Sequence, residues 1–382
     1  MIYLDSAATT PVSDHVFESM IPWLRDKYHN PGAVYRAGRN AAEAISTARA
    51  RVAEFMKARP EQIVFTSGGS EGNSLVFHCV MERLKDSNKK HIVVSAIEHD
   101  SVIMAAENLV KHGFSVSYIP VSNDGSVECG KLASMITPET GLVSVMYINN
   151  ETGAINLVED IGQLCEENGV LFHSDCVQAA GFLPIDVARI RCDYATISAH
   201  KIHGPKGVGC VYMKNPEKSS PLIHGGHGQE FGLRGGTENV AGIVGMGVAA
   251  SDTVIPNNEL WKLRHLFARK ILDELGSTVH INGDLLSPGK ILNVMIDGVD
   301  ADTFVMAMDL SDVCISAGSA CRSHSLEPSR TLLAMGLTPD EARSSVRISF
   351  SSMNTKAEVE SAASRFVTCV RLLRGDMYDI KK

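Results

Sequence analysis

Residues 194–213, YATISAHKIHGPKGVGCVYM, carry the clearest indication of the fold. Two apolar runs, at residues 194–199 and 208–213, flank a polar segment that is rich in glycine. Short apolar runs bounded by glycine are typical of buried strands. Lys201 therefore stands where a buried strand is expected to end.

The same alternation extends upstream to about residue 40. Residues 41–58 have helical periodicity and many helix-forming residues, and residues 62–69 then read as a strand that runs into glycines. Further strands are expected at residues 91–96, 142–148 and 169–175. Apolar strands that alternate with helices predict an α/β fold, with a mostly parallel sheet covered on both faces.

The pattern changes after about residue 250. A long amphipathic helix is expected at residues 258–275, followed by short strands and further helices. We therefore predict a large domain at residues 12–250 and a small α+β domain formed by residues 1–11 and 251–382. The connecting stretch, residues 220–239, is dense in glycine and is expected to be a functional loop.

The composition is that of an ordinary globular protein, with 382 residues of which 44% are hydrophobic and 21% charged. The formal net charge of −8 argues against direct binding of nucleic acid through bulk electrostatics. No run approaches the roughly 20 apolar residues that span a bilayer, and residues 1–12 lack the basic and apolar regions of a signal peptide. We therefore expect a cytoplasmic protein that does not bind membranes.

The nine cysteines do not form a recognisable framework. Their number is odd and no pair has CxxC spacing, which argues against a disulfide scaffold or a zinc site, and we expect no metal. Most lie in apolar surroundings and are expected to be small buried hydrophobic residues. Cys321 differs, because its stretch SAGSACRSHSLEPSR (residues 316–330) consists mainly of small and polar residues.

Polar residues follow five of the expected strands. In open α/β sheets, ligands bind beyond the carboxyl ends of the strands. The stretch TSGGSEGN (residues 66–73) opens a helix and is a candidate phosphate cradle, although a plain strand-to-helix turn has the same pattern. The candidate ligand-binding residues at these ends include Ser70, His99, Asn150, Asp175, Gln178, His200 and Lys201.

The candidate phosphate cradle, the strand-end lysine Lys201 and the strand-end acid Asp175 together suggest pyridoxal 5′-phosphate. Burial at a strand end would lower the pKa of Lys201 and free its amine for Schiff-base chemistry. Asp175 could pair with a protonated ring nitrogen, as pyridoxal enzymes require. His99 could stack on a ring or transfer protons, although a hydrogen-bonded core histidine explains it equally well.

These motifs resemble the NifS/IscS-type cysteine desulfurases, which belong to the class-V aminotransferase family. The resemblance runs nearly end to end, and the long form of the cysteine stretch places the chain with the long-loop group. It implies the PLP-dependent transferase fold type I, which is that of aspartate aminotransferase. The matching stretches include VFTSGGSEGN (64–73), HSDCVQAAG (173–181), SAHKIHGPKGVG (198–209), LRGGTEN (233–239) and SAGSACRSHSLEPS (316–329).

The resemblance implies a role in cofactor binding for most of the candidates. Lys201 would form the Schiff base, Asp175 would hold the pyridine nitrogen and Gln178 the ring hydroxyl. His99 would stack on the ring and assist proton transfer. The residues implied at the cofactor and its phosphate are Gly69, Ser70, Asn150, Ser198, His200 and Thr237, the last from the partner subunit of a homodimer.

The resemblance also implies the reaction, in which sulfur is removed from L-cysteine to leave L-alanine. Asn150 and Arg347 would bind the substrate carboxylate, and arginine suits this bidentate role. The thiol of Cys321 would take the sulfur as a persulfide and pass it to an acceptor protein. That protein could serve iron–sulfur cluster assembly, tRNA thiolation or DNA phosphorothioation.

Other interpretations remain open at this stage. The chain could be a selenocysteine lyase-like enzyme or another pyridoxal enzyme of the same fold, or a non-catalytic sulfur-binding subunit. Cys314 is a less favoured candidate for the thiol, because SDVCISAG (residues 311–318) reads as a strand. Residues 29–36 and Ser351–Ser352 depart from the family pattern, since relatives often carry Gly-Arg at the second position.

Overall fold

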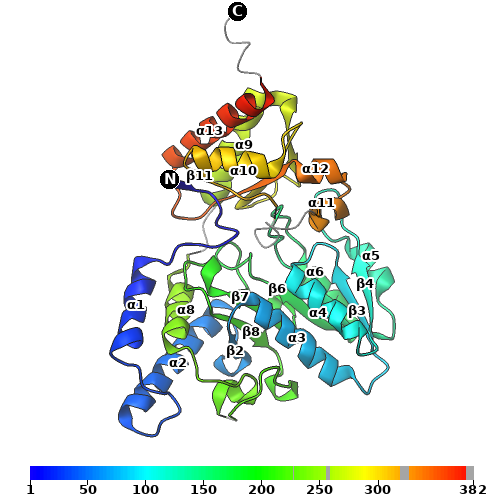
Figure 1. Cartoon of the computed structure of the whole chain (residues 1–382). Coiled ribbons are helices and arrows are strands. Elements are labelled where there is room, and N and C mark those ends of the chain that lie inside the picture. Colours follow the sequence, from blue (N-terminus) through cyan, green and yellow to red (C-terminus); the bar gives the residue numbers. More distant parts are fainter. Residues whose placement is uncertain (227, 255–258, 319–326, 376–382) are drawn as a thin grey trace, which may run out of the picture.

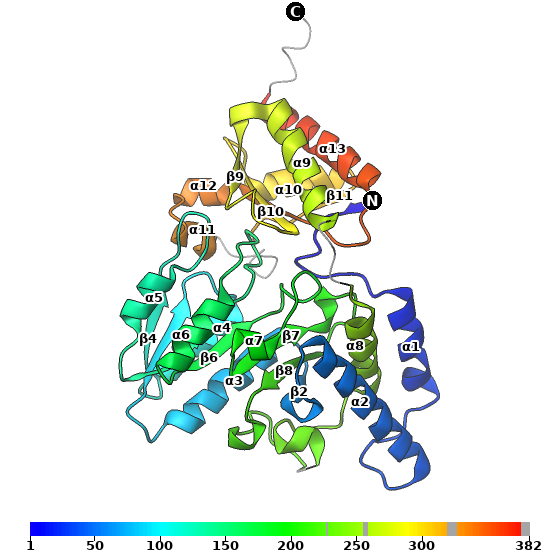
Figure 2. The ribbon, with the colours of Figure 1, turned by 180° about the vertical axis from the view of Figure 1, so that it is seen from behind.

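A computed structural model describes residues 1–226, 228–254, 259–318 and 327–375. Cys321, the predicted nucleophile, lies outside these residues. Figures 1 and 2 show a lower part built around a large sheet, and an upper part that contains the last third of the chain. The chain begins in the upper part and then runs down into the lower part.

The large sheet has seven strands in the order β2-β8-β7-β6-β5-β3-β4. Only β8 runs antiparallel to its neighbours, so the predicted mostly parallel sheet is correct. The strands are β2 (Ile63–Thr66), β3 (His91–Ser95), β4 (Ser115–Ile119), β5 (Thr140–Ser144), β6 (Leu171–Asp175), β7 (Tyr194–Ser198) and β8 (Gly209–Met213).

Helices cover both faces of this sheet because successive strand residues point to opposite sides. Val64 of β2 packs with α3 and α4, whereas its neighbours Ile63 and Phe65 join the core on the other face, with α2, α6 and α8. The helices of this part are α1 (Asp14–Arg25), α2 (Arg36–Phe55), α3 (Gly69–Leu84), α4 (Asp100–Val110), α5 (Cys129–Met135), α6 (Val158–Glu167), α7 (Val187–Ile190) and α8 (Val240–Asp252).

The upper part is built on two smaller sheets. One has the order β12-β10-β9, and the other pairs β1 with β11 in parallel, so the N-terminal residues lie beside Val313 and Cys314. The elements here are β1 (Ile2–Tyr3), β9 (Val279–Asn282), β10 (Ile291–Ile296), β11 (Val313–Cys314), β12 (Ser345–Ser349), α9 (Glu259–Leu275), α10 (Ala301–Leu310), α11 (Arg330–Ala334), α12 (Pro339–Arg343) and α13 (Lys356–Arg374). The domain boundaries at residues 11/12 and 250/251 stay a prediction.

The predicted elements correspond to observed ones with shifts of a few residues. The helix expected at residues 41–58 begins earlier, at Arg36, and the strand expected at 142–148 begins and ends earlier, as β5. Strand β4 was not anticipated; it is an edge strand that leaves Tyr118 exposed, so it lacks a continuous apolar run. None of the described helices is long and apolar enough to cross a membrane.

Candidate active site

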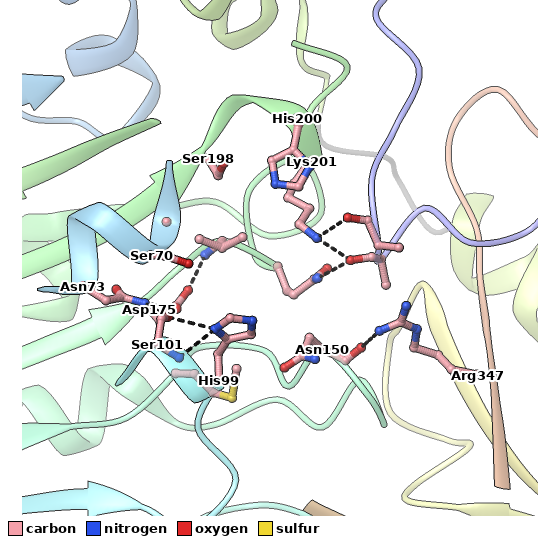
Figure 3. A pocket seen from close by; sticks show the side chains of 16 residues that line it. Ser70, Asn73, His99, Ser101, Asn150, Asp175, Ser198, His200, Lys201 and Arg347 are labelled. Carbon is pink, nitrogen blue, oxygen red and sulfur yellow. Dashed lines mark hydrogen bonds between the residues drawn. The ribbon is translucent and has the colours of Figure 1, made fainter. Parts of the chain in front are cut away.

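A cavity of about 170 Å³ lies at the carboxyl ends of β5, β6 and β7 (Figure 3). Parallel neighbouring strands end at the same edge of a sheet, which explains why residues distant in sequence meet here. The lining residues are Ala7, Ala8, Gly69, Ser70, Asn73, His99, Ser101, Met146, Asn150, Asp175, Val177, Gln178, Ser198, His200, Lys201 and Arg347.

The N-terminus of α3 forms one wall of the cavity through Gly69 and Ser70. Helix α3 has 16 residues, and its first backbone N–H groups and dipole favour an anion. Glycine is needed for this close packing: a Cβ at Gly209 would lie 2.8 Å from the Cα of Gly68, and one at Gly72 would lie 2.7 Å from Thr196 Cγ2. The turn before α3 is thereby held directly against β7 and β8.

An ion pair holds the glycine-rich loop against the same turn. Arg234 Nε donates to Glu71 Oε1 at 2.9 Å, while Glu71 Oε2 accepts from the backbone N–H of Ser67. Thr237, three residues further along, is exposed and does not line the cavity of its own chain. Its role in the site of a partner subunit stays a prediction.

Lys201 follows β7 in a short 3₁₀ turn, η2 (Ala199–Lys201). Its Nζ donates to the carbonyl oxygens of Ala7 and Ala8, the latter at 2.8 Å (Figure 3). The neighbouring His200 has a pKa lowered to about 4, first by burial and then by the charges of Lys201 and Lys206. His200 is therefore neutral near pH 7 and can act there as a hydrogen-bonding group.

Asp175, at the end of β6, is 4% exposed and its carboxylate is fixed by two hydrogen bonds. Oδ1 accepts from the backbone N–H of Val177 at 2.9 Å, and Oδ2 accepts from Asn73 Nδ2 at 2.8 Å. Burial raises the pKa of the neighbouring Glu98, and the negative charge of Asp175 adds to that rise. The sheet thus presents a well-oriented carboxylate to the cavity.

A chain of hydrogen bonds connects Asp175 to His99. Asn73 Nδ2 also donates to Ser101 Oγ at 2.9 Å, and Ser101 Oγ lies 2.8 Å from His99 Nδ1. Because His99 Nδ1 accepts the backbone N–H of Ser101 at 3.1 Å, the proton of the neutral ring is assigned to Nε2. His99 is also the N-cap of α4, which fixes the position of its ring.

Arg347 in β12 reaches the cavity from the upper part and is 1% exposed. Its Nη2 donates to Asp5 Oδ1 and its Nη1 donates to the carbonyl oxygen of Asn150, each at 2.8 Å. The buried Nε has no hydrogen-bond partner among the described residues. A guanidinium with unused donors is therefore held at the edge of the cavity.

Two buried side-chain oxygens face the same region without a partner in the described part of the chain. They are Gln178 Oε1 and Asn73 Oδ1. Gln178 Nε2 is bonded to the carbonyl oxygen of Ala7 at 2.9 Å. Buried polar atoms are normally hydrogen-bonded, so these two oxygens indicate a polar ligand.

Ten of the twelve predicted site residues line this cavity. The exceptions are Thr237, which lies in the glycine-rich loop, and Cys321, which is outside the described residues. Sequence reasoning assigned no role to Asn73, although it stands in the predicted cradle, and overlooked Asp5. Asp5 carries no local signal, because its partner Arg347 is 342 residues away.

Comparisons with known proteins agree with this geometry. Residues 2–361 match the aminotransferase class-V family. The chain is 38% identical to "Cysteine desulfurase IscS" of Dictyoglomus turgidum over 364 residues, covering 94% of this chain and 91% of the relative. Among solved structures, a "NIFS-like protein" superposes with a TM-score of 0.89 at 34% identity, covering 97% of this chain and all of that one.

A second solved structure, described as "SspA in complex with cysteine", has a TM-score of 0.80 at 34% identity. The match covers 92% of this chain and 99% of the chain in that structure. The predicted fold type I architecture is thereby confirmed, as is the resemblance inferred from the motifs. The chain belongs to the class-V aminotransferase family, in its cysteine desulfurase branch.

Proposed function

We propose that this protein is a pyridoxal phosphate-dependent cysteine desulfurase, which converts L-cysteine to L-alanine and places the sulfur on Cys321 as a persulfide. The observation that carries the proposal is the meeting of Lys201, Asp175 and Arg347 in one cavity. These are an amine, a fixed carboxylate and a buried guanidinium, drawn from three distant parts of the chain. The family membership of the chain gives independent support.

The residues present fit the cofactor. Asp175 suits a protonated ring nitrogen, because its carboxylate is buried and oriented. The free oxygen of Gln178 and the cavity position of Lys201 suit the remaining polar groups of the ring. When bound, pyridoxal phosphate stores the electron pair released at the amino-acid carbon, which no protein side chain can do.

The cofactor phosphate would be held at the N-terminus of α3. There Gly69 and Ser70 face Ser198 and His200 across the end of the sheet. His200, neutral near pH 7, would contribute a hydrogen bond and not a charge. Thr237 of the partner subunit would complete this phosphate site.

Two residues would move protons. Lys201 Nζ would hold the cofactor and would accept the proton from the substrate α-carbon. His99 would stack on the ring, and its Nε2 would take part in a further proton transfer. The link through Ser101 and Asn73 to Asp175 keeps this histidine oriented.

The substrate carboxylate would bind at Arg347 and Asn150. Arg347 has donors left over after its bonds to Asp5 and to the backbone of Asn150. A planar guanidinium can receive both oxygens of a carboxylate. This contact would fix the orientation of the amino acid in the cavity.

The sulfur would leave as the Cβ–S bond of the substrate breaks and a bond to Cys321 Sγ forms. One cysteine and one thiol give one alanine and one persulfide, so no external oxidant or reductant is needed until release. Both flanks of residues 319–326 are anchored beside the cavity, since Ser316 Oγ donates to Asp5 and Ser329 Oγ donates to Glu151. This anchoring supports Cys321 as the acceptor.

The oligomeric state, the cellular location and the sulfur acceptor belong to the same proposal. The enzyme would act as a homodimer in the cytoplasm and would bind neither membranes nor nucleic acid directly. It would pass sulfur to an acceptor protein in iron–sulfur cluster assembly, tRNA thiolation or DNA phosphorothioation. The acidic net charge of −8 supports a protein acceptor over a nucleic acid.

The proposal is tested by incubating the cofactor-loaded protein with L-cysteine and measuring alanine and protein-bound persulfide. Cys321→Ser is expected to keep the visible absorption of the bound cofactor and to carry no persulfide. Lys201→Ala is expected to lose that absorption, while Lys206→Ala, five residues away and exposed, keeps it.

Each failure has a separate meaning. A wild-type protein that cannot be loaded with the cofactor contradicts the pyridoxal assignment. Loaded protein that forms no alanine, even with a reductant, indicates a non-catalytic sulfur-binding subunit. Alanine without persulfide on Cys321 indicates a different enzyme of this fold, and persulfide on Cys314 shows that the nucleophile was misassigned.

A further inference from the structure

A second cavity, of about 410 Å³, adjoins the active site on the other side of Lys201. It lies between residues of the large-sheet part and the end of the strands β10 and β12, where the two parts in Figure 1 meet. Lys201 lines both cavities. The second cavity is lined by Ser6, Thr10, Ser13, His15, Gly181, Lys201, Ile202, His203, Ala249, Asp252, Thr253, Val254, Leu260, Lys290, Phe350, Ser351, Ser352 and Met353.

Lys290, which directly precedes β10, is the unusual residue of this cavity. It is only 7% exposed, yet its ammonium group has no hydrogen bond or ion pair among the described residues. Burying an unpaired charge is costly, and proteins normally pair such groups. The burial, together with the charge of Lys201, lowers the pKa of Lys290 to about 7.

The surroundings of Lys290 are positive on balance. The charge of Lys290 helps to lower the pKa of His203, after burial as the main cause, so these two groups are neighbours. Asp252 is the single acidic residue of the described lining, and its Oδ2 is already paired with His15 Nδ1 at 2.7 Å. No carboxylate of the described lining forms an ion pair with Lys290.

Two further features indicate a ligand at this place. The hydroxyl of Ser6 is buried and has no hydrogen-bond partner in the described part of the chain. His203 has a left-handed backbone, with φ of 60°, which costs energy in a non-glycine residue and tends to occur at functional positions. The strained turn is held by a hydrogen bond from His203 N to Thr10 Oγ1 at 2.8 Å.

We propose that this cavity binds a small oxyanion, of the size of sulfate or acetate, whose charge compensates Lys290. The anion would accept charge-assisted hydrogen bonds from the Lys290 ammonium and a further hydrogen bond from Ser6 Oγ. Lys290 precedes β10, and Ser6 lies in the N-terminal segment that is bonded to β12, so the bound anion would hold these two segments together. The site does not depend on the proposed desulfurase activity.

The test uses the cofactor-loaded full-length protein, so that the phosphate cradle at α3 is filled and cannot take the added anion. Sulfate is titrated at constant ionic strength, with calorimetry for the dissociation constant and thermal unfolding as a second readout. A ligand that binds only the native state raises the unfolding midpoint. Acetate is titrated separately, to distinguish a tetrahedral anion from a carboxylate.

Wild-type protein should bind sulfate or acetate saturably. Lys290→Met should weaken binding at least about tenfold, or about 1.4 kcal/mol, and should fold normally because it removes a buried charge. Ser6→Ala should weaken binding by a smaller factor, and Lys356→Met, an exposed control on α13, should leave it unchanged. Absence of saturable binding to the wild type, or an unchanged dissociation constant in Lys290→Met, would overturn the proposal.

Discussion

Replacement of Arg347 by methionine tests the substrate site most directly. The guanidinium offers five N–H donors, of which one serves Asp5 and one serves the carbonyl oxygen of Asn150. Three donors remain, including the buried Nε. Two of them can meet the two oxygens of a substrate carboxylate.

The expected loss follows from those two bonds. A hydrogen bond to a charged group contributes about 1.5–3 kcal/mol, so Arg347→Met should cost about 3–6 kcal/mol of transition-state binding. This corresponds to a fall of about 10²- to 10⁴-fold in kcat/KM for L-cysteine. The assay is alanine formation by cofactor-loaded enzyme under a fixed concentration of reductant.

The same substitution also affects folding, and a second variant separates the two effects. Arg347→Met strands the mostly buried carboxylate of Asp5, whose side chain is 14% exposed, and breaking such a pair costs about 3–5 kcal/mol. The double variant Asp5→Asn/Arg347→Met should regain most of that stability in urea unfolding but none of the activity. Arg343→Met, which removes an exposed arginine of α12, serves as the control for both measurements.

Recovery of activity would refute the reasoning. The loss of a single charge-assisted bond already predicts a fall of more than tenfold in kcat/KM. If the kcat/KM of the double variant is within about threefold of the wild-type value, Arg347 does not bind the substrate. Its effect would then be limited to holding Asp5 and the N-terminal segment.

Two further predictions concern stability. Glu230 accepts hydrogen bonds from both Nη atoms of buried Arg49, so Glu230→Gln should lower the free energy of unfolding by about 3–5 kcal/mol. The pair replacement Arg49→Met/Glu230→Leu should recover most of this loss in urea titrations; a double variant as unstable as Glu230→Gln would contradict the explanation. His173 is fully buried, and burial lowers its pKa to about 4. Between pH 4 and the unfolded-state pKa of about 6.5, the unfolded chain binds more protons than the folded chain. The contribution of the neutral, buried ring to stability is therefore complete above that range and is lost as the pH falls through it. His173→Gln should therefore flatten the decline of the thermal midpoint between pH 6.5 and 4.5, and an unchanged slope would show that other groups cause it.

Local patterns were sufficient for the elements that carry an unbroken apolar run. Strands β7 and β8 were predicted from residues 194–213 because both are buried along their whole length. The cradle residues at α3 were predicted for a similar reason, since a strand, glycines and a helix follow one another directly. Edge strand β4 was missed because an exposed edge relaxes the demand for apolar residues.

The sequence by itself therefore determined the alternating α/β organisation and most of the residues that face the active-site cavity. Only the tertiary structure decided which distant groups pair: Asp5 with Arg347, Asn73 with Asp175, and Glu71 with Arg234. It alone also revealed that Lys290 is buried without an ion-pair partner among the residues that the structure describes. The reason is physical. Strand ends and hydrophobic faces follow from residues that are neighbours in the sequence. The partner of a polar group depends instead on which distant segments the order of strands in the sheet brings together.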